Sequence, residues 1–158
     1  RKDLKILLLQ IRDDANVRKE ELDSFAKYSE LELDQFTVLN VFDVHVNRMP
    51  IRGTFSDVYY TKGKFLLAFD HNACDENERN TISFDSAVGT IKLVQVAGLV
   101  ARRIICYANK GNTMEIGDRL GFMRFGSRID LILPKKVRLE VKVGQKVMGN
   151  TTIIGTFD

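Results

Sequence analysis

From residue 43 onward, the chain is a succession of short runs rich in β-branched and aromatic residues, separated by Gly, Asn and Asp. This pattern is typical of all-β folds, because each run forms a strand and each interruption a turn. One interruption is long: residues 61–80 are polar except at 65–69, and so long a connection in a compact domain usually carries function. The pattern predicts strands at 43–47, 54–60, 81–85, 90–97, 100–107, 119–125, 128–133, 137–142 and 151–156.

The first 42 residues follow a different pattern. An unbroken apolar run at 5–11 is typical of a strand that is covered on both faces. Apolar residues between 17 and 29 fall roughly on one helical face, and a second strand-like run follows at 35–42. We therefore predict a right-handed strand–helix–strand (βαβ-like) unit over 1–42, followed by a β domain over 43–158. The predicted fold class is mainly β, a barrel or sandwich with this unit at its N-terminus.

Size and charge narrow the class of protein. A chain of 158 residues is long enough for one domain, or one domain with a small appended unit. No apolar stretch approaches the roughly 18 residues of a membrane-spanning helix. The net charge of +3 divides into −2 over residues 1–42 (7 basic, 9 acidic) and +5 over residues 43–158 (17 basic, 12 acidic). The weak positive charge of residues 43–158 is compatible with binding to an anionic surface, such as a membrane or nucleic acid. An ordinary solvated surface explains it equally well.

Cys74 and Cys106 lie 32 residues apart without a paired motif, the pattern of a reduced, intracellular protein. His71 and Cys74 have H-x-x-C spacing, but a structural zinc site takes four ligands and the other His and Cys are isolated. We therefore expect no metal. The early apolar run is too short for a signal peptide, so we expect a cytoplasmic protein with at most peripheral contact to the cell membrane.

One glycine–serine pair stands inside an apolar, strand-forming run, Gly121–Asp130 (GFMRFGSRID). Glycine is poor in a strand interior unless the backbone must bend or approach another group closely. Gly126 leaves its carbonyl open to attack, and the Ser127 hydroxyl follows directly. The simpler interpretation is a strand bulge with Ser127 facing solvent.

Four segments, in this order and spacing, resemble the short branch of the phosphatidylserine decarboxylase family, over residues 42 to about 155. The segments are FDVHVNRMP (42–50), GKF (63–65) through DENERN (75–80), QVAGLVARRI (95–104) and RFGSR (124–128). The resemblance implies that the protein cuts itself between Gly126 and Ser127, with Ser127 attacking the Gly126 carbonyl and His45 acting as the base. It also implies that Ser127 becomes a pyruvoyl group, which serves as the electron sink when phosphatidylserine, or a related serine phospholipid, loses CO2.

The same resemblance makes Arg102, Arg103 and Phe65 candidates for binding the lipid. Other interpretations stay open for each. Arg102 and Arg103 are neighbours on a strand, so at most one of them faces a lipid phosphate. Phe65 can instead be a core residue, and His45, which stands between two valines, can be a surface residue of a strand. The implied partners are the lipid at a membrane surface and the protein's own two cleavage fragments, with no nucleic acid; a homodimer stays open.

Two further resemblances concern the fold. KILLLQIRDD and QFTVLNVFD resemble the start of a class I glutamine amidotransferase-like protein, but neither cysteine sits in a G-x-C-x-G motif. The paired glycine turns of 110–121 and 143–149 resemble the halves of a biotinyl/lipoyl-like barrel, although no carrier lysine is evident. The sequence also departs from the decarboxylase family, because it contains no Asp-Gly pair to orient the histidine. The alternative function is therefore a non-catalytic chimera or remnant that keeps the fold.

Overall fold

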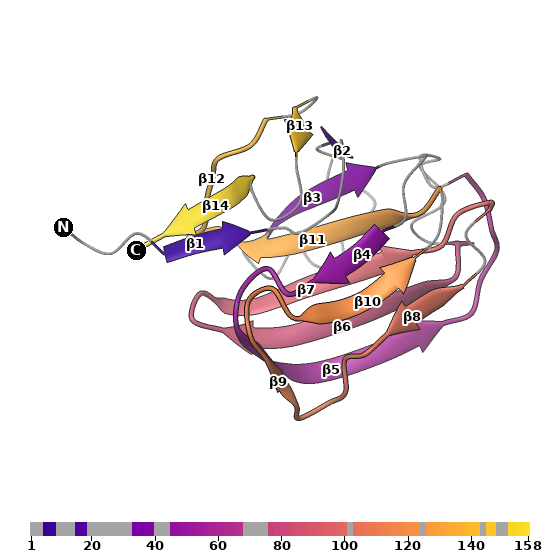
Figure 1. Cartoon of the computed structure of the whole chain (residues 1–158), viewed down its shortest axis with the longest axis horizontal. Helices are drawn as coiled ribbons and strands as arrows, with labels where there is room; N and C mark the ends of the chain where they lie inside the picture. Colours follow the sequence, from indigo (N-terminus) through magenta and orange to yellow (C-terminus); the bar gives the residue numbers. More distant parts are fainter. Residues whose placement is uncertain are drawn as a thin grey trace.

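The computed structural model describes residues 45–67, 76–100, 103–123, 126–142, 145–147 and 152–158, together with three N-terminal strands at 5–8, 15–18 and 33–39. The described residues form fourteen strands (Figure 1). None of them belongs to a helix long and apolar enough to cross a membrane. The strands are β1 (Lys5–Leu8), β2 (Ala15–Arg18), β3 (Leu33–Leu39), β4 (His45–Arg48), β5 (Gly53–Thr61), β6 (Arg79–Ser86), β7 (Gly89–Val96), β8 (Ile104–Cys106), β9 (Thr113–Met114), β10 (Arg119–Met123), β11 (Arg128–Pro134), β12 (Arg138–Leu139), β13 (Lys146–Val147) and β14 (Ile153–Phe157).

The strands are arranged in three sheets. The largest has eight strands in the order β13-β2-β3-β11-β7-β6-β5-β9. One three-stranded sheet has the order β4-β10-β8, and the other has the order β1-β14-β12. Neighbouring strands in all three sheets run antiparallel. In Figure 1 the β4-β10-β8 sheet lies over the strands β7, β6 and β5 of the large sheet.

The prediction of a mainly β protein is confirmed. The runs predicted at 54–60, 81–85, 90–97 and 128–133 are the long strands β5, β6, β7 and β11. The predicted strand at 137–142 is shorter in the structure, since β12 covers only residues 138–139, and β8 covers 104–106 within the predicted 100–107, of which 101–102 lie outside the described residues. The resemblance to a lipoyl-like barrel stays a prediction.

The parallel strand–helix–strand arrangement predicted for the N-terminus is wrong. Strand β1 pairs antiparallel with β14, whereas β3 pairs antiparallel with β2 and β11 in a different sheet. Val17 lies in β2 instead of starting a helix, and the remainder of the predicted helix lies outside the described residues. Short apolar runs do not determine their own partners, and β-branched Val17 suits a strand as well as a helix. The division of the chain at residue 42 stays a prediction.

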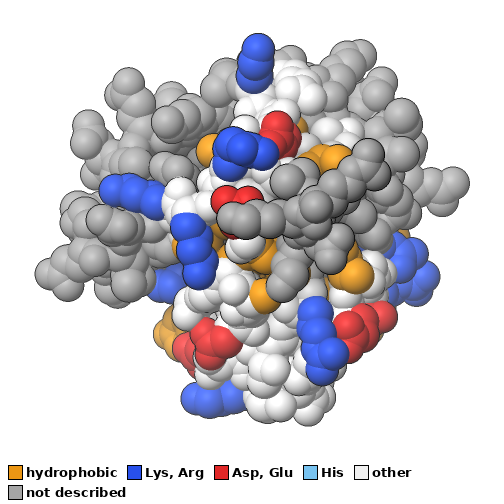
Figure 2. Space-filling model, turned by 90° about the vertical axis from the view of Figure 1, so that its left-hand side faces the viewer, with side chains coloured by type: hydrophobic (Ala, Val, Ile, Leu, Met, Phe, Trp, Pro, Cys, Tyr) orange, Lys and Arg blue, Asp and Glu red, His pale blue; other side chains and the backbone are white. Residues whose placement is uncertain are grey.

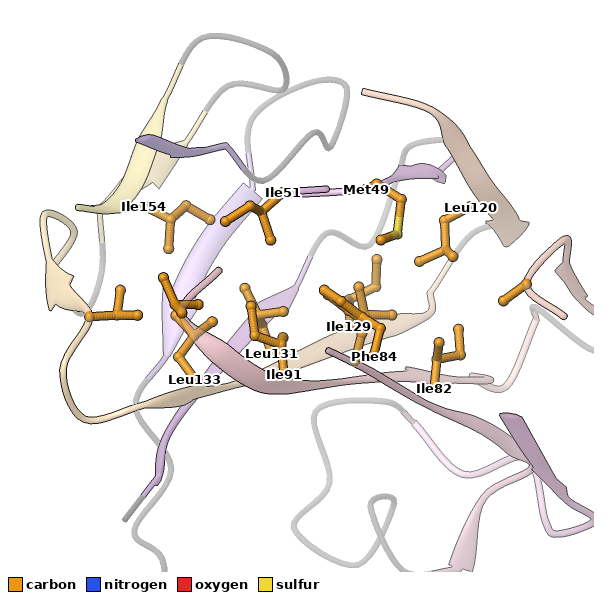
Figure 3. Close-up of a cluster of buried hydrophobic side chains, with 14 of the residues drawn as sticks. Met49, Ile51, Ile82, Phe84, Ile91, Leu120, Ile129, Leu131, Leu133 and Ile154 are labelled. Carbon is orange, nitrogen blue, oxygen red and sulfur yellow. The ribbon is translucent and has the colours of Figure 1, made fainter. Parts of the chain in front are cut away.

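A single large cluster of buried hydrophobic side chains fills the space between the sheets (Figure 3). Alternate residues of β11, β7 and β6 point into it, among them Leu131, Ile91 and Phe84, while Met49 and Leu120 face them from the opposite side. Phe55 and Phe84 pack edge to face within it, with ring centroids 6.1 Å apart. This packing holds β11, the strand that follows Ser127, rigidly at the centre of the large sheet.

Candidate active site

The Gly126–Ser127 pair forms the turn that leads into β11. Gly126 has a φ of +74°, in the left-handed region that side chains other than glycine rarely adopt. Ser127 is 1% exposed, so the interpretation as a bulge with a solvent-facing serine is wrong. The Ser127 Oγ is buried without a hydrogen-bond partner among the residues that the structure describes. A buried unpaired hydroxyl costs about 1–3 kcal/mol, so its presence in a protein calls for an explanation.

The backbone of Gly98 lies directly against the Gly126–Ser127 peptide bond. A Cβ built on Gly98 would lie 1.6 Å from the Gly126 carbonyl oxygen, 2.6 Å from its carbonyl carbon and 3.4 Å from the Ser127 nitrogen. These are backbone atoms at the start of β11, which cannot move away as a flexible side chain can. Only glycine at position 98 therefore fits this arrangement, and Gly98 forms a wall of the site.

Asn77 is fully buried beside this wall. Its Nδ2 donates hydrogen bonds to the carbonyls of Leu66 (2.9 Å) and Ala97 (2.8 Å), and its Oδ1 accepts one from the Leu66 N–H (2.8 Å). Ala97, the residue before Gly98, also donates from its N–H to the Glu78 carbonyl at 2.8 Å. Asn77 thus connects the segment at 63–67 to the residue that precedes Gly98.

A second polar cluster lies in the core between β4, β7 and β10. The Gln95 Nε2 donates to the Asn47 Oδ1 at 2.6 Å, and the Asn47 Nδ2 is buried without a partner among the described residues. Gly121 makes room for this contact, because a Cβ there would lie 2.7 Å from the Gln95 Nε2. Gln95 precedes Val96, which pairs with Arg128 across β7 and β11.

Directly after Ser127, Arg128 and Asp130 form a buried ion pair. The Arg128 Nε donates to the Asp130 Oδ1 at 2.7 Å and Nη2 donates to Oδ2 at 2.9 Å. Their side chains are 0% and 1% exposed. This two-pronged geometry is the strongest form of the Arg–carboxylate contact, and it fixes the start of β11.

The structure describes some of the predicted site residues completely and others only in part or not at all. His45 is the first residue of β4 and pairs across the ladder with Met123, four positions before Ser127. The His45 side chain lies outside the described part of the structure, as do Arg102, His71 and Cys74. Phe65 is half-buried in the segment that Asn77 holds, and Arg103 is exposed immediately before β8. The roles of these residues stay predictions.

Gly98, Asn77 and Gln95 were missed by sequence reasoning, although all three lie in the motif segments. One signal was present for Gly98, a glycine that stands inside the apolar run at 96–101. Asn77 and Gln95 carried no comparable signal, because a polar residue in a polar loop or strand is ordinarily solvated.

The surface carries charges of both signs. On the face shown in Figure 2, Lys and Arg side chains of the described residues are interspersed with Asp and Glu, with small hydrophobic areas between them. Larger exposed apolar side chains occur beside the wall of the site, where Leu99 and Val100 are 49% and 67% exposed and Leu67 is 46% exposed. Since Asn77 joins Leu66 to Ala97, these three side chains belong to adjoining segments.

Comparison with known proteins identifies close relatives of the sequence. The model of the family described as phosphatidylserine decarboxylase matches residues 19–155. This match includes part of the stretch that we compared with amidotransferases. A phosphatidylserine decarboxylase proenzyme of Chlorobaculum parvum is 44% identical over 117 residues, which are 74% of this chain and 55% of that protein. The chain thus spans about half the length of this curated relative. No solved structure gives a significant match.

Proposed function

The chain belongs to the phosphatidylserine decarboxylase family, and from this premise we propose that it is a self-processing lipid decarboxylase. It cleaves itself between Gly126 and Ser127 and then converts phosphatidylserine, or a related serine phospholipid, into the ethanolamine phospholipid. The observation that carries the proposal is the Ser127 Oγ, which is buried and has no hydrogen-bond partner among the described residues. It follows the Gly126 carbonyl, which lies against the backbone of Gly98.

Self-cleavage starts with the attack of the Ser127 Oγ on the Gly126 carbonyl carbon. The hydroxyl proton passes to a base, for which the neutral imidazole of His45 is the candidate, and the amide nitrogen takes up a proton as its bond to carbon breaks. An ester now joins the two residues. Loss of the Cα proton of residue 127 expels the Gly126 carboxylate, which takes the former Ser127 Oγ with it, and leaves a dehydroalanine. Protonation of the dehydroalanine Cβ gives an imine, and addition of water to that imine releases ammonia and leaves a ketone.

The ketone is a pyruvoyl group at the new N-terminus of β11. Such a group supplies an electrophilic carbonyl that takes up the electron pair when a substrate carboxylate leaves as CO2. The residues fit the formation of this group: the Ser127 Oγ, buried without a hydrogen-bond partner among the described residues, is the nucleophile that begins it, and Gly98 places no side chain against the Gly126 carbonyl. The buried Arg128–Asp130 pair anchors the residues that follow it.

We further propose that the lipid is bound at a membrane surface, on the cytoplasmic side; exposed apolar and basic side chains support the contact with lipid. The exposed Leu67, Leu99 and Val100 lie in segments that adjoin the wall of the site, where they can contact acyl chains. Arg103 is exposed just beyond them and can pair with a lipid phosphate, a role in which Arg102 is its alternative. Phe65 is in the segment that ends at Leu67.

A conversion assay on vesicles tests the proposal. The purified chain is incubated with phosphatidylserine vesicles, and ethanolamine phospholipid is measured by mass spectrometry; Ser127→Ala is the matched control. We expect product from the wild-type chain and none from Ser127→Ala. A cleaved chain that leaves the lipid unchanged overturns the assigned substrate. A folded chain that stays uncleaved supports the alternative, a remnant in which the missing Asp-Gly leaves the histidine without an orienting carboxylate.

A further inference from the structure

Asn77 uses every hydrogen-bonding group of its side chain on backbone. The amide accepts from the Leu66 N–H at 2.8 Å and donates to the Leu66 carbonyl at 2.9 Å, as a neighbouring strand would do. Its second N–H donates to the Ala97 carbonyl at 2.8 Å. Because Asn77 is 0% exposed, water does not compete for these three bonds.

The bond to Ala97 replaces a strand ladder that has just ended. Strand β7 pairs with β6 and β11 as far as Val96. Ala97 follows. Its carbonyl accepts a hydrogen bond from Asn77 Nδ2, and its N–H donates one to the Glu78 carbonyl, both at 2.8 Å. The next residue is Gly98, whose backbone lies against the Gly126 carbonyl. These two bonds therefore set how closely the wall approaches the peptide bond that is cut.

The two hydrogen bonds from Asn77 to the Leu66 backbone hold a second segment, residues 63–67, against the same side chain. Around it, the Lys64 N–H donates to the Glu76 carbonyl at 2.7 Å, and the Glu78 N–H donates to the Lys64 carbonyl at 3.0 Å. Gly63 approaches this backbone closely, since a Cβ there would lie 2.4 Å from the Glu76 carbonyl oxygen. The segment at 63–67, which includes the exposed Leu67, and the wall at Gly98 are thus joined through one buried side chain.

We propose that Asn77 is a positioning residue for self-cleavage, which holds Gly98 against the Gly126 carbonyl and couples this wall to the segment at 63–67. The inference rests on the proposed function. Displacement of reacting groups by about 1 Å can cost on the order of 100-fold in rate, so loss of Asn77 slows cleavage far more than it reduces the folded fraction.

The test compares cleavage rates of Asn77→Ala, Asn77→Asp and Asn109→Ala with the wild-type chain, measured by intact mass over time. Asn109 is the matched control, because its Nδ2 donates to a backbone carbonyl, that of Tyr107 at 3.2 Å, at an exposed position. We expect Asn77→Ala to cleave about 100-fold more slowly and Asn109→Ala to cleave normally. Thermal unfolding of each variant in a Ser127→Ala background, which blocks cleavage, measures the folded fraction separately.

The pH dependence of cleavage by the Asn77→Asp variant distinguishes a positioning role from a merely structural one. A carboxylate keeps the bond from the Leu66 N–H but cannot donate to either carbonyl, whereas the protonated acid can donate once. Burial against two carbonyls favours the protonated form. The cleavage rate of Asn77→Asp relative to Asn77→Ala should therefore rise as the pH falls from 8 to 5. If Asn77→Ala proves too unstable to assay, the same rise at low pH is measured for Asn77→Asp relative to the wild-type chain, and no rise there overturns the inference.

The outcomes separate the inference from the function on which it rests. Wild-type cleavage with equally fast cleavage by Asn77→Ala overturns the inference alone. A pH-independent ratio of Asn77→Asp to Asn77→Ala also overturns it, even if both variants are slow. A wild-type chain that stays intact overturns the proposed function and the inference together.

Discussion

The Cα of Gly98 and the carbonyl of Gly126 lie so close that a Cβ on Gly98 would sit 1.6 Å from the carbonyl oxygen. The two residues are far apart in the sequence, and each is a glycine for its own reason. Gly126 takes up a φ of +74°, and Gly98 allows the close approach. Together they hold the peptide bond before Ser127 at the end of β7.

Gly98→Ala should nearly abolish self-cleavage. The added methyl group must displace the Gly126 carbonyl, and a shift of about 1 Å lowers the rate on the order of 100-fold. Gly111→Ala is the control: it has a φ of +87° with open space around the added Cβ, so it strains only the backbone. Cleavage is followed by gel electrophoresis. Equal cleavage by Gly98→Ala and Gly111→Ala would show that the close contact has no role.

The two cleavage products should stay together. Strand β11 belongs to the C-terminal product and pairs along its length with β3 on one side and β7 on the other, both from the N-terminal product. We expect the products to elute as one species in native size-exclusion chromatography and to separate only in denaturant. Separation in native buffer would contradict the central position of β11.

Removing one member of the buried Arg128–Asp130 pair should be strongly destabilising. Arg128→Met leaves a buried carboxylate without its counter-ion, which lowers the free energy of unfolding by about 3–5 kcal/mol. The double variant Arg128→Met/Asp130→Val should recover most of this loss, because it joins the apolar cluster of Val94, Val96 and Ile132 on the same face. Denaturant unfolding in the Ser127→Ala background measures both, and a double variant no more stable than the single one would refute the explanation.

Cys106 should react slowly with thiol reagents at neutral pH. Burial raises the pKa of its thiol, and a backbone hydrogen bond involving Ala108 offsets part of that rise. A raised pKa leaves less thiolate at a given pH, so labelling should speed up as the pH rises through the raised pKa. The measurement uses Cys74→Ser, with the urea-unfolded chain as reference. Labelling as fast in the folded chain as in urea would contradict this prediction.

Sequence patterns predicted the β strands of the domain well but not the pairing of its first residues. The strands β6 and β7 alternate apolar and polar residues, and the turn between them is marked by Ser86 and by Gly89, which has a φ of +100°, so local signals are enough. The partner of β1 is β14, at the other end of the chain, and no local signal encodes a contact of that range. The parallel pairing expected of the first N-terminal strands is wrong for this reason, whereas most of the predicted helix lies outside the described residues.

The proposed cleavage site could be predicted from the sequence, whereas its surroundings could not. The Gly126–Ser127 pair stood out because glycine and serine interrupt an apolar run, and the motif order supplied His45 as the base. The wall at Gly98 and its support by Asn77 depend on tertiary distances, which residue types alone do not specify. Burial of Ser127, which removes the simpler interpretation, is also visible only in the folded chain.

The intact mass of the purified chain tests the central claim most directly. Cleavage between Gly126 and Ser127 divides the 18.0 kDa chain into pieces of roughly 14 and 3.6 kDa, by apportioning the mass over the residues. The account predicts these two masses, with a ketone in place of serine at the N-terminus of the smaller piece, and only the intact mass for Ser127→Ala. A single species of 18.0 kDa that persists for days in the folded wild-type chain would contradict it.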